Sequence, residues 1–163
     1  MLWDLTAMSA GTTFPSLTVL DTSGSAVQLD GLLPSSVCIL VTATEGAYGE
    51  QELAALGKLR TDYGAYATFI SIALDRTPGQ LETWLKARPD RDWKWFTPAD
   101  RQPLLDALRL RSIPTPYLLK ERELTASPGP LPSQGLAAAL FRIKTKADEE
   151  QRLKFGRGAP PKH

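Results

Sequence analysis

The sequence predicts an α/β fold in which strands and helices alternate along the chain, with β-hairpins near both ends. A continuous apolar run over residues 37–41, bounded by Pro34 and Gly46, is typical of a buried central strand. Residues 50–60 follow with apolar side chains at helical spacing. A second apolar run over residues 67–74 completes a β–α–β unit, which is the repeating unit of α/β proteins.

Two hairpins flank this unit. Residues 17–20 alternate apolar and polar side chains, and the turn-forming stretch 21–24 joins them to a second short strand at 26–29. Near the other end, an apolar strand follows Pro114, and Glu121–Arg122 makes a tight connection to a partner strand at residues 123–125. A hairpin at each end therefore adds antiparallel strands to the β–α–β unit.

The remaining elements follow from capping residues and spacing. Thr77 is expected to cap a helix that has Pro78 at its first position. Residues 92–96 are expected to form a strand, and residues 97–100 to begin a short helix. Ser133 is expected to cap the final helix.

Composition indicates one domain of ordinary size. The chain has 163 residues, 42% of them hydrophobic, and a formal net charge of +1, so no bulk charge favours nucleic acid. No apolar run is long enough to cross a bilayer, so we expect no integral membrane segment. We expect a lead-in at residues 1–13, a domain at 14–143 and a charged C-terminal extension at 144–163 with a flexible end. From Arg142 onward the sequence contains seven basic residues and three acidic ones.

Few residues could support catalysis. Cys38 is the only cysteine, and the only histidine is the terminal His163, so a metal site has no credible set of ligands. We expect no metal, no cofactor and no catalytic residue. Cys38 lies within an apolar run, where a free cysteine usually behaves as a small hydrophobic residue.

The stretch after the central strand, residues 42–51, lies where α/β proteins usually place their sites. It contains no Cys, His, Lys or Arg, and only Thr44, Tyr48 and two glutamates could take part in chemistry. Glu45 and Glu50 have no nucleophile nearby, so a solvated loop and a helix N-terminus explain them better than an acid–base pair. Tyr48 either serves binding or folds over the loop.

Trp93 and Trp95 offer another kind of site. Alternation places both indoles on one side of the predicted strand, where they could stack on a small molecule. Core packing is the more common role of such a pair. Ligand binding by the tryptophans is therefore the weaker hypothesis.

The order of these elements resembles that of thioredoxin-like proteins, and in particular the TlpA and AhpC/TSA branch. The resemblance rests on Phe14–Pro15 with the hairpin after it, on the strand–loop–helix at the centre, and on Ser112–Thr115 before the last hairpin. It covers about residues 14–141. It implies a thioredoxin-like fold, in which helices flank a central mixed β-sheet and a β-hairpin forms the N-terminus.

The sequence differs from this family at the residues that carry out the redox chemistry. Members of that family carry Cys-X-X-Cys after the central strand, and aligning Glu52 with the family's helix start places the two cysteines at Gly46 and Gly49. The chain reads Gly46-Ala47-Tyr48-Gly49, a degenerate form of the motif. Dithiol exchange requires an attacking thiolate and a resolving thiol, and neither is present. If the geometry of the motif is retained, cysteines introduced at both glycines should form a disulfide readily.

A second family feature is retained. Ile113–Pro114 matches the family's cis-proline site, where the residue before the proline offers main-chain hydrogen bonds to an extended client chain. Such binding needs no sulfur. Pro114 either serves this groove or only shapes the loop.

The resemblance therefore implies a redox-inactive domain that binds a protein or peptide partner or serves in assembly, with the groove at Ile113 and Pro114. The alternative is a thiol-disulfide oxidoreductase or peroxiredoxin relative that acts through Cys38 or through a partner's thiols. If the family resemblance holds, we expect a periplasmic or cell-envelope location; if it does not, we expect a cytoplasmic one.

Overall fold

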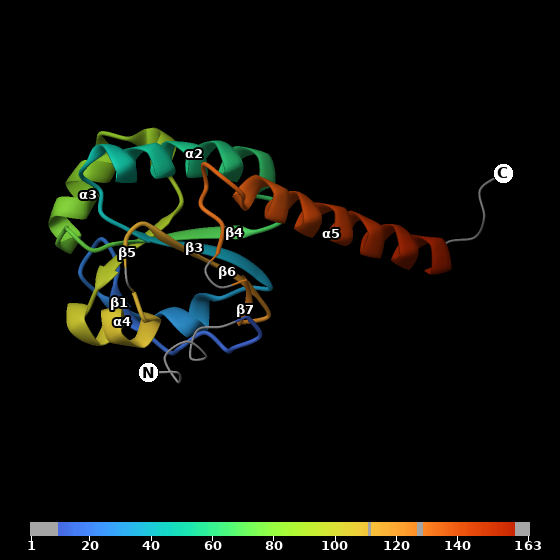
Figure 1. Cartoon of the computed structure of the whole chain (residues 1–163), viewed down its shortest axis with the longest axis horizontal. Coiled ribbons are helices and arrows are strands. Elements are labelled where there is room, and N and C mark those ends of the chain that lie inside the picture. Colours follow the sequence, from blue (N-terminus) through green and yellow to red (C-terminus); the bar gives the residue numbers. More distant parts are fainter. Residues whose placement is uncertain (1–9, 111, 127–128, 159–163) are drawn as a thin grey trace.

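The computed structural model describes residues 10–110, 112–126 and 129–158. In this part of the chain, strands form one seven-stranded sheet with helices on both faces (Figure 1). Across the sheet the strand order is β2-β1-β5-β4-β3-β6-β7. The strands are β1 (Thr18–Leu20), β2 (Ala26–Gln28), β3 (Ser36–Thr42), β4 (Thr68–Ala73), β5 (Lys94–Pro98), β6 (Thr115–Lys120) and β7 (Glu123–Ala126).

The sheet is mixed, as the sequence predicts. The central strand β3 is buried along its whole length and pairs parallel with β4, which pairs parallel with β5. On its other side β3 pairs antiparallel with β6. The predicted hairpins are present as β1–β2 and β6–β7, one at each edge of the sheet.

Helices cover the two faces unequally. The longer helices α2 and α3 and the start of α5 lie over one face, and α4 lies on the other (Figure 1). Each face carries an apolar core, because the buried side chains of β3 and β4 alternate between the two. The helices are η1 (Leu29–Leu32), α2 (Ala47–Tyr63), α3 (Pro78–Lys86), η2 (Pro89–Arg91), α4 (Arg101–Leu108) and α5 (Leu136–Gly158).

Some predicted boundaries are confirmed and others are wrong. Thr77 caps α3, and its Oγ1 accepts from the backbone N–H of Gln80 while the Gln80 side chain accepts from that of Thr77. Thr97 and Pro98 end β5 instead of opening α4, because Leu20 and Val19 of β1 extend the ladder to them.

The connection between β6 and β7 uses two residues in the left-handed region. Glu121 and Arg122 have φ angles of 52° and 69°. Both central positions of a two-residue hairpin turn need positive φ when the turn matches the twist of the strands. The tight connection is as predicted, although the residues are not the glycine or asparagine that usually mark such a turn.

The chain ends in a helix that extends away from the sheet (Figure 1). Helix α5 runs across residue 143 without a break, so the charged extension expected from residue 144 begins within a continuous helix. The flexible end was expected beyond residue 155; residues 156–158 are helical, and 159–163 lie outside the described residues. Within the described part, no helix is both long and apolar enough to cross a bilayer.

Of the expected lead-in, residues 1–9 lie outside the described residues, and the last part pairs with the sheet. Thr13 bridges Glu123 of β7. The backbone N–H of Gly11 donates to the Leu124 carbonyl at 2.7 Å, and that of Leu124 donates to Thr12 at 2.9 Å. This segment covers the outer edge of β7.

Candidate functional site

The turn after β3 is fixed by an aspartate that follows β4. The backbone N–H groups of Thr44 and Glu45 donate to the Asp75 carboxylate at 2.9 and 3.1 Å, and the Thr44 hydroxyl donates to it at 3.1 Å. Arg76 donates to the Thr44 hydroxyl and pairs with Glu45 at 3.4 Å. Parallel strands end at the same edge of a sheet, so Asp75 lies where it can hold this turn. The turn sets the position of Gly46.

Helix α2 begins earlier than the sequence predicts. Gly46 is its N-cap, with φ 100° and ψ 148°, and Ala47, Tyr48 and Gly49 form its first turn instead of an open loop. That backbone region is essentially restricted to glycine. At Gly49 a Cβ atom would lie 2.6 Å from the carbonyl oxygen of Ala43.

These two positions therefore require glycine for different reasons: backbone angles at Gly46 and space at Gly49. Strain at both positions argues against the expectation that cysteines introduced there would form a disulfide readily. A side chain at either position would strain the start of the helix. The local backbone therefore favours glycine over a residue with a side chain at both positions.

The second part of the predicted site is the segment before β6. The Ile113–Pro114 peptide bond is cis. Thr115, the first residue of β6, donates its hydroxyl to the Ser112 carbonyl and closes this segment on itself. The β3–β6 ladder ends at the pair Val41–Thr115, so Ile113 lies beyond the ladder.

The structure brings the start of α2 and the segment before β6 together. Tyr48, Ile113 and Pro114 line one open hollow of about 530 Å³. Of the residues predicted for the site, Gly46, Ala47 and Gly49 do not line it. The tyrosine is 58% exposed and the isoleucine 40% exposed. The other lining residues come from the segment before β6, from β6 itself and from the stretch before α5: Ser112, Thr115, Pro116, Gly129, Pro130, Leu131 and Gln134. We call this hollow the cis-proline groove.

A buried acid supports the groove from beneath. Glu52 lies in α2 and is only 1% exposed. Its carboxyl group accepts from the backbone N–H of Ser133 at 3.0 Å and from the Ser133 hydroxyl. Ser133 therefore does not cap α5, which begins at Leu136, and the prediction for it is wrong. In the sequence, Glu52 stands beside the apolar residues that predict α2, which hints at burial. Its partner Ser133 lies 81 residues away and could not be identified from the sequence.

Cys38 is no part of this groove. Its side chain lies in the middle of β3 and is fully buried in the core beneath α2. Burial raises the pKa of the thiol from 9.0 to about 12. Because the thiolate is the nucleophile in disulfide exchange, this cysteine is held in an unreactive state near neutral pH.

The tryptophans belong to the core. Trp95 is buried and stacks on Trp93 with ring centroids 5.4 Å apart, and it meets Trp84 edge-on at 5.3 Å. The Trp93 indole N–H donates to Ser71 and that of Trp95 to the Arg91 carbonyl. Packing and satisfied donors explain both side chains without a ligand. Among the described residues, no cluster of His, Cys, Asp and Glu could hold a metal ion.

Comparison with known proteins supports the fold. No family model and no curated protein sequence matches the chain. Solved structures do match. A candidate thiol-disulfide oxidoreductase from Bacteroides vulgatus superposes with a TM-score of 0.72 at 19% identity, covering 83% of this chain and 97% of that one.

Two further structures agree. The thioredoxin domain of a thiol-disulfide oxidoreductase from Bacteroides vulgatus has a TM-score of 0.61 at 21% identity, covering 72% of this chain and 86% of that one. A thiol:disulfide interchange protein from Bacteroides sp. has a TM-score of 0.64 at 17% identity, with coverage of 74% and 81%. Identities this low establish architecture and not activity. The chain has a thioredoxin-like fold.

Proposed function

We propose that this chain is a redox-inactive thioredoxin-like domain that binds an extended segment of a partner protein in the cis-proline groove. One observation carries the proposal: Tyr48 of α2 and Ile113–Pro114 line the same hollow, and both large side chains are exposed. An exposed aromatic and an exposed aliphatic side chain on a common concave surface are typical of a protein-binding site.

The composition of the groove suits a peptide with an apolar anchor. Five of its lining residues, Ile113, Pro114, Pro116, Pro130 and Leu131, are apolar, and Ser112, Thr115 and Gln134 supply polar groups. Because Ile113 lies beyond the end of the β3–β6 ladder, its main chain is located where an extended segment could add by strand-like hydrogen bonding.

The absence of reactive sulfur supports binding over exchange. The sequence has one cysteine, and that thiol is buried with its pKa raised to about 12. The groove contains neither of the two thiols that dithiol exchange needs. These facts argue against the alternative of an oxidoreductase that acts through Cys38.

A display selection tests the proposal. Unstructured peptides from a random library are selected on the wild-type chain, and the affinity of the best one is measured for the Tyr48→Ala variant. Loss of an aromatic anchor should weaken binding by about 1–2 kcal/mol. Stability should change by less than about 0.5 kcal/mol, because the side chain is mostly exposed.

Phe141→Ala is the matched control. Phe141 is 56% exposed on α5 and does not line the groove, so its removal should leave peptide binding unchanged. Peptides that bind both variants equally well would show that the groove is not the binding site. A Tyr48→Ala variant that loses stability but keeps its peptide affinity would show that Tyr48 serves packing alone.

A further inference from the structure

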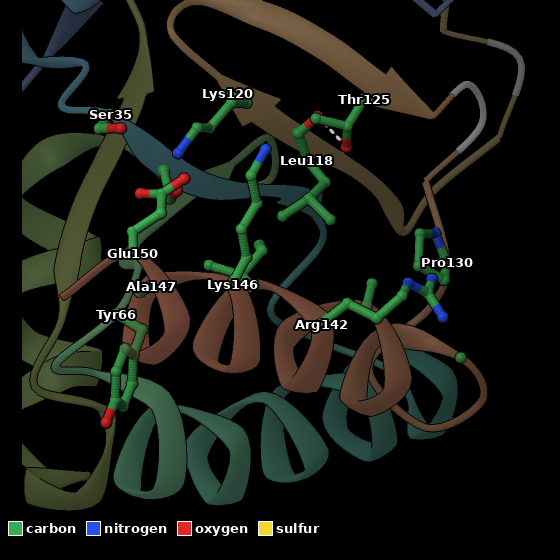
Figure 2. A pocket seen from close by; sticks show the side chains of 14 residues that line it. Ser35, Tyr66, Leu118, Lys120, Thr125, Pro130, Arg142, Lys146, Ala147 and Glu150 are labelled. Carbon is green, nitrogen blue, oxygen red and sulfur yellow. Dashed lines mark hydrogen bonds between the residues drawn. The ribbon is translucent and has the colours of Figure 1, made fainter. Parts of the chain in front are cut away.

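A second, larger hollow lies on the same side of the sheet, between α5 and the strands of the last hairpin (Figure 2). Its volume is about 780 Å³. It forms where α5 leaves the sheet, and three small residues leave the space open: Gly135, just before the helix, and Ala139 and Ala147 within it. It shares Pro130 with the cis-proline groove and is otherwise separate from it. We call it the α5 hollow.

The inner wall of the α5 hollow is apolar. Leu118 of β6 and Ala139 of α5 are buried at its base, and Ile143 and Ala147 continue the apolar surface along the helix. A hollow of this size lies within the range of roughly 300–1,000 Å³ that small-molecule sites occupy. Its base offers a hydrocarbon chain an apolar surface that is already partly desolvated.

The rim of the hollow is cationic. Lys120 comes from β6, and Arg142 and Lys146 come from α5. Figure 2 shows the Lys120 and Lys146 amines pointing into the space between helix and strand. Among the described residues, no ion pair involves any of these three cations, and the lining contains one acid, Glu150. The excess of positive charge beside an apolar wall attracts an anion.

The sheet edge argues against a peptide as the occupant. An extended peptide would add to the outer edge of β7, but residues 11–14 already cover that edge through the Gly11–Leu124 and Phe14–Arg122 hydrogen bonds. The hollow itself offers an apolar wall and a cationic rim.

We propose that the α5 hollow binds a single-chain amphiphile that carries one carboxylate. The chain lies along Leu118, Ala139 and Ile143, and the carboxylate lies between the Lys120 and Lys146 amines. The residues proposed to hold the amphiphile do not line the cis-proline groove, so the proposal does not rest on the peptide site.

Calorimetric titration of the full chain with dodecanoate, below its micelle concentration, tests the proposal. Two further probes separate the contributions: dodecyltrimethylammonium has the same chain with the opposite charge, and acetate has the charge without the chain. Dodecanoate should bind saturably at one site, the cation at least about tenfold more weakly, and acetate not measurably.

The Lys120→Gln/Lys146→Gln double variant should weaken dodecanoate binding by about tenfold or more, because both amines face the carboxylate. Lys154→Gln is the matched control: it removes one charge from the same helix, outside the hollow, and should leave the affinity unchanged. All three substituted lysines are exposed, so the variants should fold normally.

Three results would overturn the proposal. They are no saturable dodecanoate binding to the wild type, equal affinity for the cationic probe, and unchanged affinity in the double variant. Adsorption to phosphatidylglycerol vesicles without binding of monomeric dodecanoate would also overturn it, because the basic rim would then be a membrane-facing surface.

Discussion

Tyr48 and Glu52 lie one turn apart on α2, but they meet opposite surroundings. The tyrosine is 58% exposed on the rim of the cis-proline groove, whereas the glutamate is 1% exposed beneath it. Residues four apart share one face of a helix, so the same face carries an exposed rim at its start and a buried polar contact one turn later. Under the proposed function, binding depends on Tyr48 and stability on Glu52, so different residues of one short segment carry the two properties.

The difference shows how the groove is held. Glu52 binds Ser133, and the neighbours Leu131 and Gln134 form one wall of the groove. Gly49 allows the first turn of α2 to approach Ala43 closely. Changes to the buried supports should cost stability, and changes to the exposed rim should cost binding.

The largest effect on stability is expected at Ser133. Ser133→Ala removes a donor to the buried Glu52 carboxyl group, and an unsatisfied buried acceptor costs about 1–3 kcal/mol. The free energy of unfolding from urea denaturation measures the loss. Ser35→Ala is the matched control, because Ser35 also donates to a glutamate, Glu121, at 2.7 Å but at an exposed site. If both substitutions cost the same, the buried contact adds nothing beyond a surface hydrogen bond.

The Glu52–Ser133 contact also marks the limit of what the sequence predicts. Strands such as β3 and β4 were predictable because continuous apolar runs report burial on both faces. The pairing of Glu52 with Ser133 was not, because local spacing carries no information about a partner 81 residues away.

The candidate site was predictable in part. The sequence indicated Tyr48, Ile113 and Pro114, and the structure brings these three to one hollow. It did not indicate that Ala47–Gly49 are helical, because two glycines in four residues favour a loop. The α5 hollow had no sequence signal, since it depends on the direction in which α5 leaves the sheet.

A somewhat smaller loss of stability is expected at Gly49. Gly49→Ala places a Cβ atom against the Ala43 carbonyl oxygen and should destabilise the chain by roughly 1–2 kcal/mol. Gly57→Ala, in the same helix, meets its neighbours at an ordinary 3.8 Å and should be neutral or stabilise by up to about 1 kcal/mol. Equal stability of the two variants, measured by thermal or urea unfolding, would show that α2 does not require glycine at its start.

A smaller, pH-dependent effect is expected at the ion pair between α2 and η2. Arg91 is buried and hydrogen-bonds Glu50, which holds the pKa of Glu50 below its ordinary value of 4.5. A lowered pKa in the folded state means that the pair stabilises the chain above the unfolded-state pKa, and that this contribution disappears as pH falls through the folded-state pKa.

The comparison of wild type with Glu50→Gln measures this contribution. Because Glu50 is about half exposed, the difference in unfolding free energy near neutral pH should stay below about 1 kcal/mol, and it should shrink toward zero in acid. A difference that grows as the pH falls would contradict the assignment.

The most direct test of the central claim is catalysis of disulfide reduction. The claim is that this thioredoxin-like fold retains a groove for binding and has no sulfur chemistry. Reduction of insulin by dithiothreitol is followed with wild type, with Cys38→Ala and without protein. We predict the same uncatalysed rate in all three, because Cys38 is buried and no second thiol exists. A rate that wild type raises and Cys38→Ala abolishes would contradict the account.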